Sequence, residues 1–134
     1  MVTHPRRNLE EKEWLEQHIS TGDIVLIPDV ADYEVRRELL RAEKITGIAR
    51  LDALGEALGV VSTSVGILRE AASLWAEVRR QGRPTANDAA LDVDVIIAAQ
   101  ARTIAREDHE VTVATTNVSH LSRFVDARLW PDIA

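Results

Sequence analysis

The sequence predicts a three-layer α/β domain in which a mostly parallel sheet has helices on both faces. Short apolar runs alternate with helical patterns along the chain, and this alternation is typical of parallel α/β folds. A length of 134 residues, of which 46% are hydrophobic, suits one domain with one core. No internal repeat, low-complexity stretch or linker divides the chain, so we treat residues 1–134 as a single domain.

The first half of the chain predicts helices that alternate with two apolar strands. The expected helices span 9–20, 30–43 and 47–58, and the expected strands span 24–27 and 60–63. The run at 24–27 is typical of a strand buried in a parallel sheet. Asp29 is placed to cap the helix that follows it. Residues spaced by four along that helix, Ala31, Val35 and Leu39, predict its core-facing stripe.

The second half predicts two long helices, a strand and a short helix. The expected helices span 64–80, 92–105 and 119–124, and the expected strand spans 111–114. Four residues of the first of these helices are expected to face the core: Leu68, Ala72, Trp75 and Val78. The helix from Asp92 is apolar nearly all round at its start, which predicts deep burial. The tail at 129–131 predicts an edge strand or a docked extension.

Composition and charge narrow the class of protein. A formal net charge of −6 argues against binding nucleic acid by bulk charge alone, although divalent cations at clustered carboxylates would offset it. The chain has no cysteine, which excludes disulfides and thiolate metal sites. The start has no apolar segment typical of a secretory signal, and no apolar run approaches the roughly 20 residues of a membrane span. We therefore expect a cytoplasmic protein without membrane contact.

Oxygen-bearing side chains collect where predicted strands end. Glu34 lies in the first turns of a helix that follows a strand, Asp92 and Asp94 lie at the start of the buried helix, and Thr116 and Asn117 follow the last predicted strand. Sites of open parallel sheets lie beyond the carboxyl ends of the strands. Oxygen ligands select hard cations such as Mg²⁺ or Mn²⁺, which activate water and stabilise charge on a phosphoryl group. The pattern therefore predicts a metal site for phosphodiester hydrolysis.

Each acidic residue also has a structural alternative. Asp92 can serve only as a helix cap, as an aspartate at a helix start usually does. Glu34 can pair with Arg37 or Arg41 on its own helix, an ion pair of small energy. Asp94 stands against an apolar run, so its charge needs a partner, and the alternative to a metal is an arginine of another helix.

Three stretches resemble the PIN domain, and within it the toxin ribonucleases of the VapC type. They are IPDVADYEVRRELL at 27–40, GRPTANDAALDVDVIIAAQA at 82–101 and VTVATTNVSHLSRF at 111–124. In the first, Glu34 matches the family's helical glutamate, and in the second, Asp94 matches its acidic position. In the third, Thr116, Asn117 and His120 match the loop after the strand. None is decisive alone, but their order and spacing make them fairly specific together.

The resemblance implies an Mg²⁺ or Mn²⁺ site and cleavage of single-stranded RNA by metal-activated water. It also implies a homodimer or swapped oligomer and a cognate antitoxin. Glu34, Asp92 and Asp94 are then the metal candidates, with Thr116 or Asn117 positioning a phosphate or the attacking water. Arg83, in the Gly-Arg-Pro loop, and His120 are candidates for contact with RNA, although a plain surface role is open for both. The alternative function is a non-catalytic PIN-fold module that binds an antitoxin or another protein.

One departure concerns the N-terminal strand. The family opens with a central strand that ends in a metal-binding aspartate, and this chain has no such segment before its first helix; position 120, often acidic in the family, is histidine. Three explanations are open: translation starts upstream of Met1, the chain is a naturally shortened relative, or another segment or subunit supplies the strand. A lost central strand leaves backbone groups to be paired elsewhere, which predicts a swapped oligomer or a sheet closed around the gap.

Overall fold

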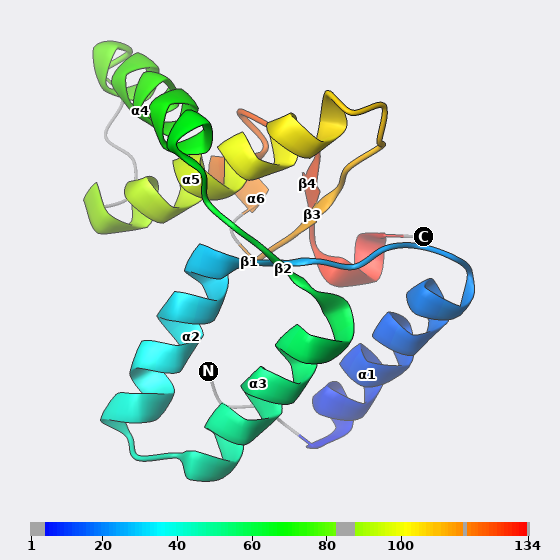
Figure 1. Cartoon of the computed structure of the whole chain (residues 1–134). Coiled ribbons are helices and arrows are strands. Elements are labelled where there is room, and N and C mark those ends of the chain that lie inside the picture. The colour runs from blue at the N-terminus through cyan, green and yellow to red at the C-terminus, as the bar shows by residue number, and fades with distance from the viewer. Residues whose placement is uncertain (1–4, 83–87, 117, 134) are drawn as a thin grey trace.

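Helices dominate the computed structural model, which describes residues 5–82, 88–116 and 118–133 (Figure 1). The helices are α1 (Pro5–Ser20), α2 (Asp29–Arg41), α3 (Ile45–Leu58), α4 (Val65–Arg80), α5 (Asp88–Ala105), α6 (Val118–Leu121) and the 3₁₀ helix η1 (Trp130–Asp132). The strands are β1 (Ile27–Pro28), β2 (Val60–Val61), β3 (Val113–Ala114) and β4 (Ala127–Arg128). The predicted order of helices and strands is confirmed, with shifted boundaries and shorter strands.

The strands form two separate parallel pairs. β1 pairs with β2, with Ile27 opposite Val60, and β3 pairs with β4, with Val113 opposite Ala127. Parallel pairing is therefore confirmed, but within the described ranges the two pairs do not join into one sheet. A single sheet closed around a missing strand, one of the two predicted outcomes, is therefore not formed among the described residues.

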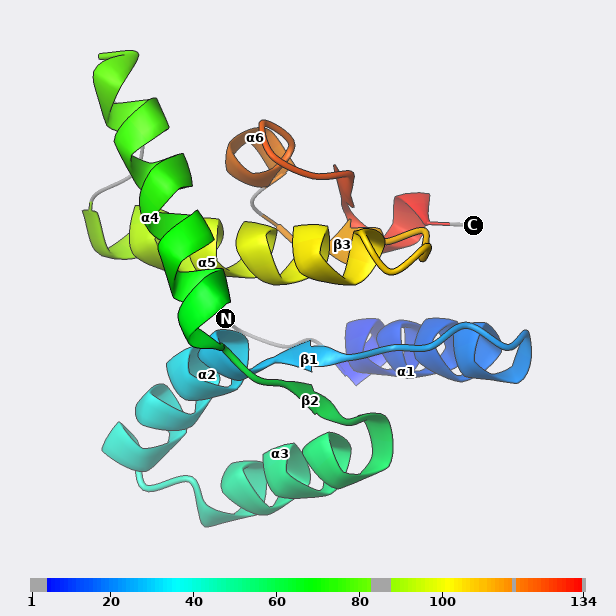
Figure 2. The same ribbon diagram turned by 45° about the horizontal axis from the view of Figure 1, so that its top comes forward.

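The helices lie on both sides of the first strand pair. Figures 1 and 2 both show α5 on one side of β1 and β2 and α3 on the other. In both views α2 and α3 form a hairpin that points away from α4 and α5. Helices that flank short parallel strands agree with the predicted α/β class.

The buried core lies between α4, α5 and the C-terminal segment. Its members are Ile67, Ala71, Leu74, Val78, Leu91, Val95, Ala98, Ala99, Leu121 and Ala127. The predicted burial of the start of α5 is confirmed, because Leu91 and Val95 are 4% and 3% exposed. By contrast, neither α2 nor α3 contains a fully buried residue. Hydrophobic packing therefore fixes α4 against α5 more firmly than it fixes α2.

The predicted inward face of α4 is wrong except at Val78. Leu68 and Trp75 are 49% and 36% exposed, and Ala72 is exposed as well. The buried stripe is offset along the helix and consists of Ile67, Ala71, Leu74 and Val78. Both stripes repeat at three- and four-residue spacing, so periodicity alone cannot choose the one that meets α5.

Three expectations about the segment before α3 are also wrong. Ile24 and Leu26 were predicted in a buried strand, but they are 80% and 43% exposed. The strand begins only at Ile27 and pairs with β2 along one edge. Val35, predicted in the core stripe of α2, is 50% exposed. The N-cap of α2 is Pro28 rather than Asp29.

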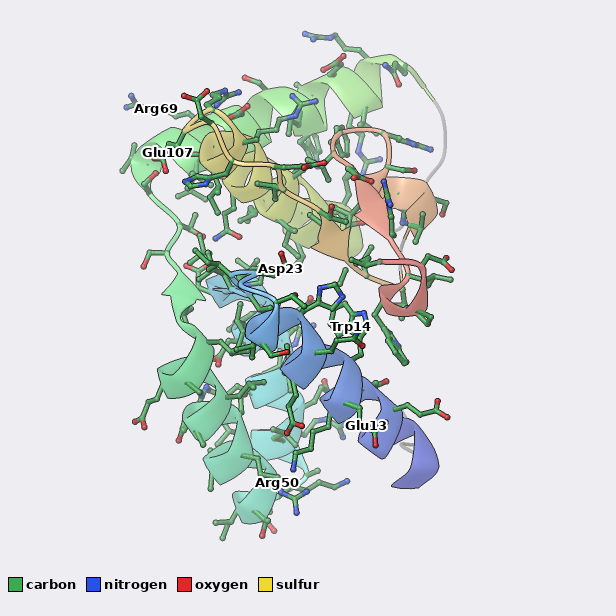
Figure 3. The ribbon with its side chains drawn as sticks, turned by 90° about the vertical axis from the view of Figure 1, so that its right-hand side faces the viewer. Glu13, Trp14, Asp23, Arg50, Arg69 and Glu107 are labelled. Carbon is green, nitrogen blue, oxygen red and sulfur yellow. The ribbon has the colours of Figure 1, made fainter. Side chains whose placement is uncertain are left out.

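The C-terminal tail is docked against α1, as one of the two sequence alternatives predicted. Figure 3 shows Trp14 on the side of α1 that faces this tail, and the Trp14 Nε1 donates a hydrogen bond to the Ile133 carbonyl at 3.4 Å. The rings of Trp14 and Trp130 meet edge to face with centroids 5.8 Å apart. Within the described ranges no helix is long and apolar enough to cross a membrane.

Candidate functional site

Asp94 is a buried carboxylate without a complete set of partners. It lies on α5, and only 5% of its surface is exposed. Its Oδ2 is buried and accepts no hydrogen bond from the residues that the structure describes. The Nδ1 of His120, on α6, lies 3.6 Å from that oxygen, which is an ion-pair distance beyond hydrogen-bond range. Because buried polar groups are nearly always paired, this oxygen is a candidate ligand atom.

The surroundings of Asp94 disfavour its charge in the isolated chain. Burial raises the pKa of Asp94 above its ordinary value of 3.8; the nearby His120 opposes this shift, and the negative charge of Glu34 adds to it. A cation bound beside Asp94 would stabilise the carboxylate form. The sequence left open a salt bridge between Asp94 and an arginine of another helix. In the structure the side chain that contacts Asp94 is His120.

Glu34 approaches Asp94 closely enough for their charges to interact. Its side chain is 40% exposed on α2, and its Oε2 lies 3.9 Å from the Nη2 of Arg37. That distance makes a loose ion pair, which leaves carboxylate oxygens able to bind another cation. The other predicted alternative does not occur, because Arg41 pairs with Glu38 at 2.6 Å.

Of the other predicted residues, the structure describes Asp92 and Thr116, and neither of them is buried. Asp92 is exposed on α5 and Thr116 is exposed after β3. Asn117 and Arg83 lie outside the described residues. Within residues 5–82, 88–116 and 118–133, no three His, Asp or Glu side chains form a cluster suited to a metal ion. Among the predicted residues that the structure describes, Asp94 contacts His120 and is within the electrostatic influence of Glu34.

A polar network beside the site was missed by the sequence reasoning. The Asp29 carboxylate accepts hydrogen bonds from the backbone N–H of Thr63 at 2.8 Å, the Thr63 hydroxyl at 2.7 Å and the Gln100 amide at 2.8 Å. It also accepts one from the backbone N–H of Val30 at 2.8 Å. Burial opposes the ionisation of Asp29, but these hydrogen bonds prevail and lower its pKa below 3.8. The sequence does carry a signal for this network, since Gln100 interrupts the apolar run at 95–101 and is 2% exposed.

Comparison with known proteins identifies a structural neighbour. The sequence matches no family model, and no curated protein matches it. A chain of VapBC-1 from nontypeable Haemophilus influenzae has a similar structure, with a TM-score of 0.67 and 18% sequence identity over 90% of this chain and 87% of that chain. This chain shares its fold with that VapBC-1 chain. The likeness is one of fold alone, because the identity is low.

Glu34 and Asp94 lie far apart in the sequence, and the negative charge of Glu34 contributes to the raised pKa of Asp94. Asp94 comes from the well-packed α5, whereas Glu34 comes from α2, which has no buried residue. Two carboxylates in this arrangement can bind a hard divalent cation that completes its shell with water or phosphate oxygens. This is the chemistry that the sequence predicts, and metal binding by the two carboxylates stays a prediction.

Proposed function

We propose that this chain is an Mg²⁺- or Mn²⁺-dependent endoribonuclease of the PIN type that hydrolyses single-stranded RNA. The observation that carries the proposal is the buried Oδ2 of Asp94, which accepts no hydrogen bond from the described residues and lies within the field of Glu34. Mg²⁺ in phosphoryl-transfer sites is usually held by one or two carboxylates, with water and substrate phosphates as the other ligands. Glu34 and Asp94 are the proposed ligands. When bound, the cation would supply an activated water and stabilise charge on the phosphoryl group.

The other polar residues have supporting roles in this proposal. His120 is half-buried beside Asp94 and can donate a hydrogen bond to a phosphate oxygen of RNA. Thr116 and Asn117 would position a phosphate or the attacking water, and Asp92 would assist the metal from the exposed side of α5. Arg83 would bind phosphate through its guanidinium fork.

Cleavage of a labelled single-stranded RNA tests the proposal. We expect weak cleavage with Mn²⁺ or Mg²⁺ and none in excess chelator. Glu34→Gln should lower the cleavage rate by about 100-fold, because it removes a charged ligand. The control is Glu38→Gln, one turn further along α2, where the carboxylate pairs with Arg41 in solvent. Cleavage that survives both Glu34→Gln and chelator would come from a contaminating nuclease and would overturn the proposal.

We further propose an oligomer and a cognate antitoxin as partners. Within the described residues β1 pairs only with β2, and the Ile27 N–H donates to the Gly59 carbonyl just before β2, so the other edge of β1 is unpaired. Ile24 and Leu26 lie shortly before β1, and their side chains are exposed. An unpaired edge with exposed apolar side chains favours association with another chain. The antitoxin is supported by the resemblance to VapC toxins and by the VapBC-1 neighbour.

Light scattering on the purified chain measures its oligomeric state. We expect a dimer or larger assembly that Ile24→Lys weakens, because the substitution places a charge beside the unpaired edge. Ile45→Lys is the matched control, since Ile45 is 79% exposed and Ile24 is 80% exposed. A monomer at all concentrations, or equal effects of the two substitutions, would argue against association through this edge.

A non-catalytic binding module is the second candidate. It is favoured by the lack, in the described ranges, of a three-residue cluster suited to a metal. Such a module would keep the fold and bind an antitoxin or another protein without cutting RNA. Calorimetric titration with Mn²⁺ separates the two candidates: binding that depends on Asp94 supports the nuclease, and no binding supports the module.

A further inference from the structure

We infer that Asp29, Thr63 and Gln100 form a positioning network that sets the distance between Glu34 and Asp94, an inference that rests on the proposed function of that pair. The network joins the first residue of α2, the turn before α4 and the middle of α5. Glu34 lies on α2 and Asp94 lies on α5, so the network connects the two helices that carry the acidic pair.

The three side chains form a closed arrangement. The Gln100 Nε2 donates to the Asp29 Oδ1 at 2.8 Å and to the Thr63 Oγ1 at 3.0 Å, while that hydroxyl donates to the Asp29 Oδ1 at 2.7 Å. The Oδ2 of Asp29 accepts from the Thr63 backbone N–H at 2.8 Å. Both oxygens of Asp29 are therefore engaged by donors, in contrast to the Oδ2 of Asp94. This difference assigns Asp29 to holding the structure and Asp94 to binding a ligand.

Packing does not provide the same restraint on α2. The core is built from α4, α5, α6 and β4, and α2 contributes no fully buried residue to it. Arg36 of α2 donates to Asp52 of α3 at 2.7 Å, so this ion pair ties α2 to its hairpin partner rather than to α5. A helix held by few apolar contacts depends on its polar contacts for orientation.

Small displacements within the network are expected to change the distance between the Glu34 and Asp94 carboxylates. Glu34 follows Asp29 by about 7.5 Å along the axis of α2, and Asp94 precedes Gln100 by about 9 Å along α5, at a rise of 1.5 Å per residue. A pivot of α2 at Asp29 therefore moves the Glu34 carboxylate relative to Asp94. Metal sites require ligand positions held to roughly 0.5 Å. Loss of outer partners typically lowers metal affinity by about 10–100-fold.

Two variants test the network in the full chain. Gln100→Leu removes the donor that links α5 to Asp29, and Thr63→Val removes one hydroxyl while keeping the backbone bond to Asp29. Thr103→Val is the matched control, because the Thr103 hydroxyl donates within α5 to the Ala99 carbonyl at 2.9 Å. We expect the two network variants to bind Mn²⁺ about tenfold more weakly than the parent chain. Thr103→Val should retain the parent affinity.

A second measurement does not depend on metal. Because the chain has no cysteine, spin labels attach only at introduced ones. Leu40→Cys on α2 and Ala105→Cys on α5 use exposed positions. Pulsed electron–electron double resonance measures the distance between the two labels in the metal-free chain. The parent should give a narrow distribution of this distance. We expect a broader or shifted distribution in Gln100→Leu and no change in Thr103→Val.

The outcomes separate this inference from the proposed function. Weaker Mn²⁺ binding together with a changed distance distribution supports the network. Lower thermal stability with unchanged Mn²⁺ affinity and an unchanged distance would show a merely structural role and overturn it. A changed distance with unchanged affinity would also overturn it. If the parent binds no Mn²⁺, the proposed function fails, and an unaltered distance in Gln100→Leu would overturn the coupling of α2 to α5 as well.

Discussion

Asp94→Asn is expected to abolish Mn²⁺ binding, to lower metal-dependent RNA cleavage by about 100-fold or more, and to raise the melting temperature of the metal-free chain at pH 7. The first two effects follow because Asn replaces the charged oxygen that lacks a hydrogen-bond partner among the described residues. The third follows because burying a neutral amide costs less free energy than burying an ionised carboxylate. A gain of about 3 °C is expected for each kcal/mol of desolvation that is relieved.

The stability effect has a defined pH dependence. The pKa of Asp94 is raised in the folded chain, so the folded state holds this proton more tightly than the unfolded state does. The contribution of Asp94 to stability therefore falls as pH rises from its ordinary value of 3.8 through the raised value, and the penalty is complete above it. Below pH 3.8 the carboxyl is protonated in both states. The melting temperatures of Asp94→Asn and the parent should converge there.

Asp92→Asn is the matched control for the melting-temperature measurement. Asp92 lies on the same helix but is exposed, so its substitution should leave the melting temperature nearly unchanged at every pH. Scanning calorimetry between pH 3 and 8 and Mn²⁺ titration provide the measurements. A lower melting temperature for Asp94→Asn at pH 7 would mean that the carboxylate stabilises the metal-free fold, and would contradict the assignment of its oxygen as an unpaired ligand.

Leu74→Ala is expected to destabilise the chain by about 2–5 kcal/mol. Leu74 is 4% exposed and packs in the core between α4 and α5. Removing its side-chain methyl groups takes apolar surface from the core and leaves a cavity that the surrounding side chains fill only partly. Urea unfolding monitored by circular dichroism measures the free energy of unfolding, and an unchanged m-value would show that the effect is on stability.

Leu68→Ala provides the control on the same helix. Leu68 is 49% exposed, so its truncation should change the free energy of unfolding by roughly 0.5 kcal/mol or less. The two substitutions have the same intrinsic helix propensity, and their difference therefore reports burial. Equal losses for Leu68→Ala and Leu74→Ala would show that the exposed stripe of α4 is covered, for example by another chain.

The order of elements and the pairing of strands could be predicted from the sequence more completely than the packing of side chains. The alternation of apolar runs and helical patterns is a local property, and the structure confirms the order of elements and the parallel pairing of strands. The inward face of α4 was assigned to Leu68 and Trp75 instead of Leu74, since both stripes have helical spacing. Ile24 was assigned to a buried strand, but the strand begins only at Ile27, and the Ile24 side chain is exposed.

For the candidate site, too, some residues could be predicted from the sequence, whereas their contacts could not. Glu34 and Asp94 could be chosen from the sequence because each lies on a helix near the end of a strand, and Asp94 stands against an apolar run. The contact of Asp94 with His120 and the bond between Asp29 and Gln100 join residues far apart in the chain. Gln100 stands out in the apolar run at 95–101, but nothing local in the sequence indicates which carboxylate it meets.

The sequence by itself determined the α/β class, the order of elements and two acidic residues on separate helices, because hydrophobic periodicity and turn residues act over short stretches of chain. The tertiary structure decided which helix faces are buried and which carboxylate lacks partners. Asp29 and Asp94 are both aspartates on helices, yet four donors surround the first, whereas no described residue donates a hydrogen bond to the Oδ2 of the second. Burial and hydrogen-bond partners depend on segments that meet only after folding, and for these two residues they separate a structural role from a binding role.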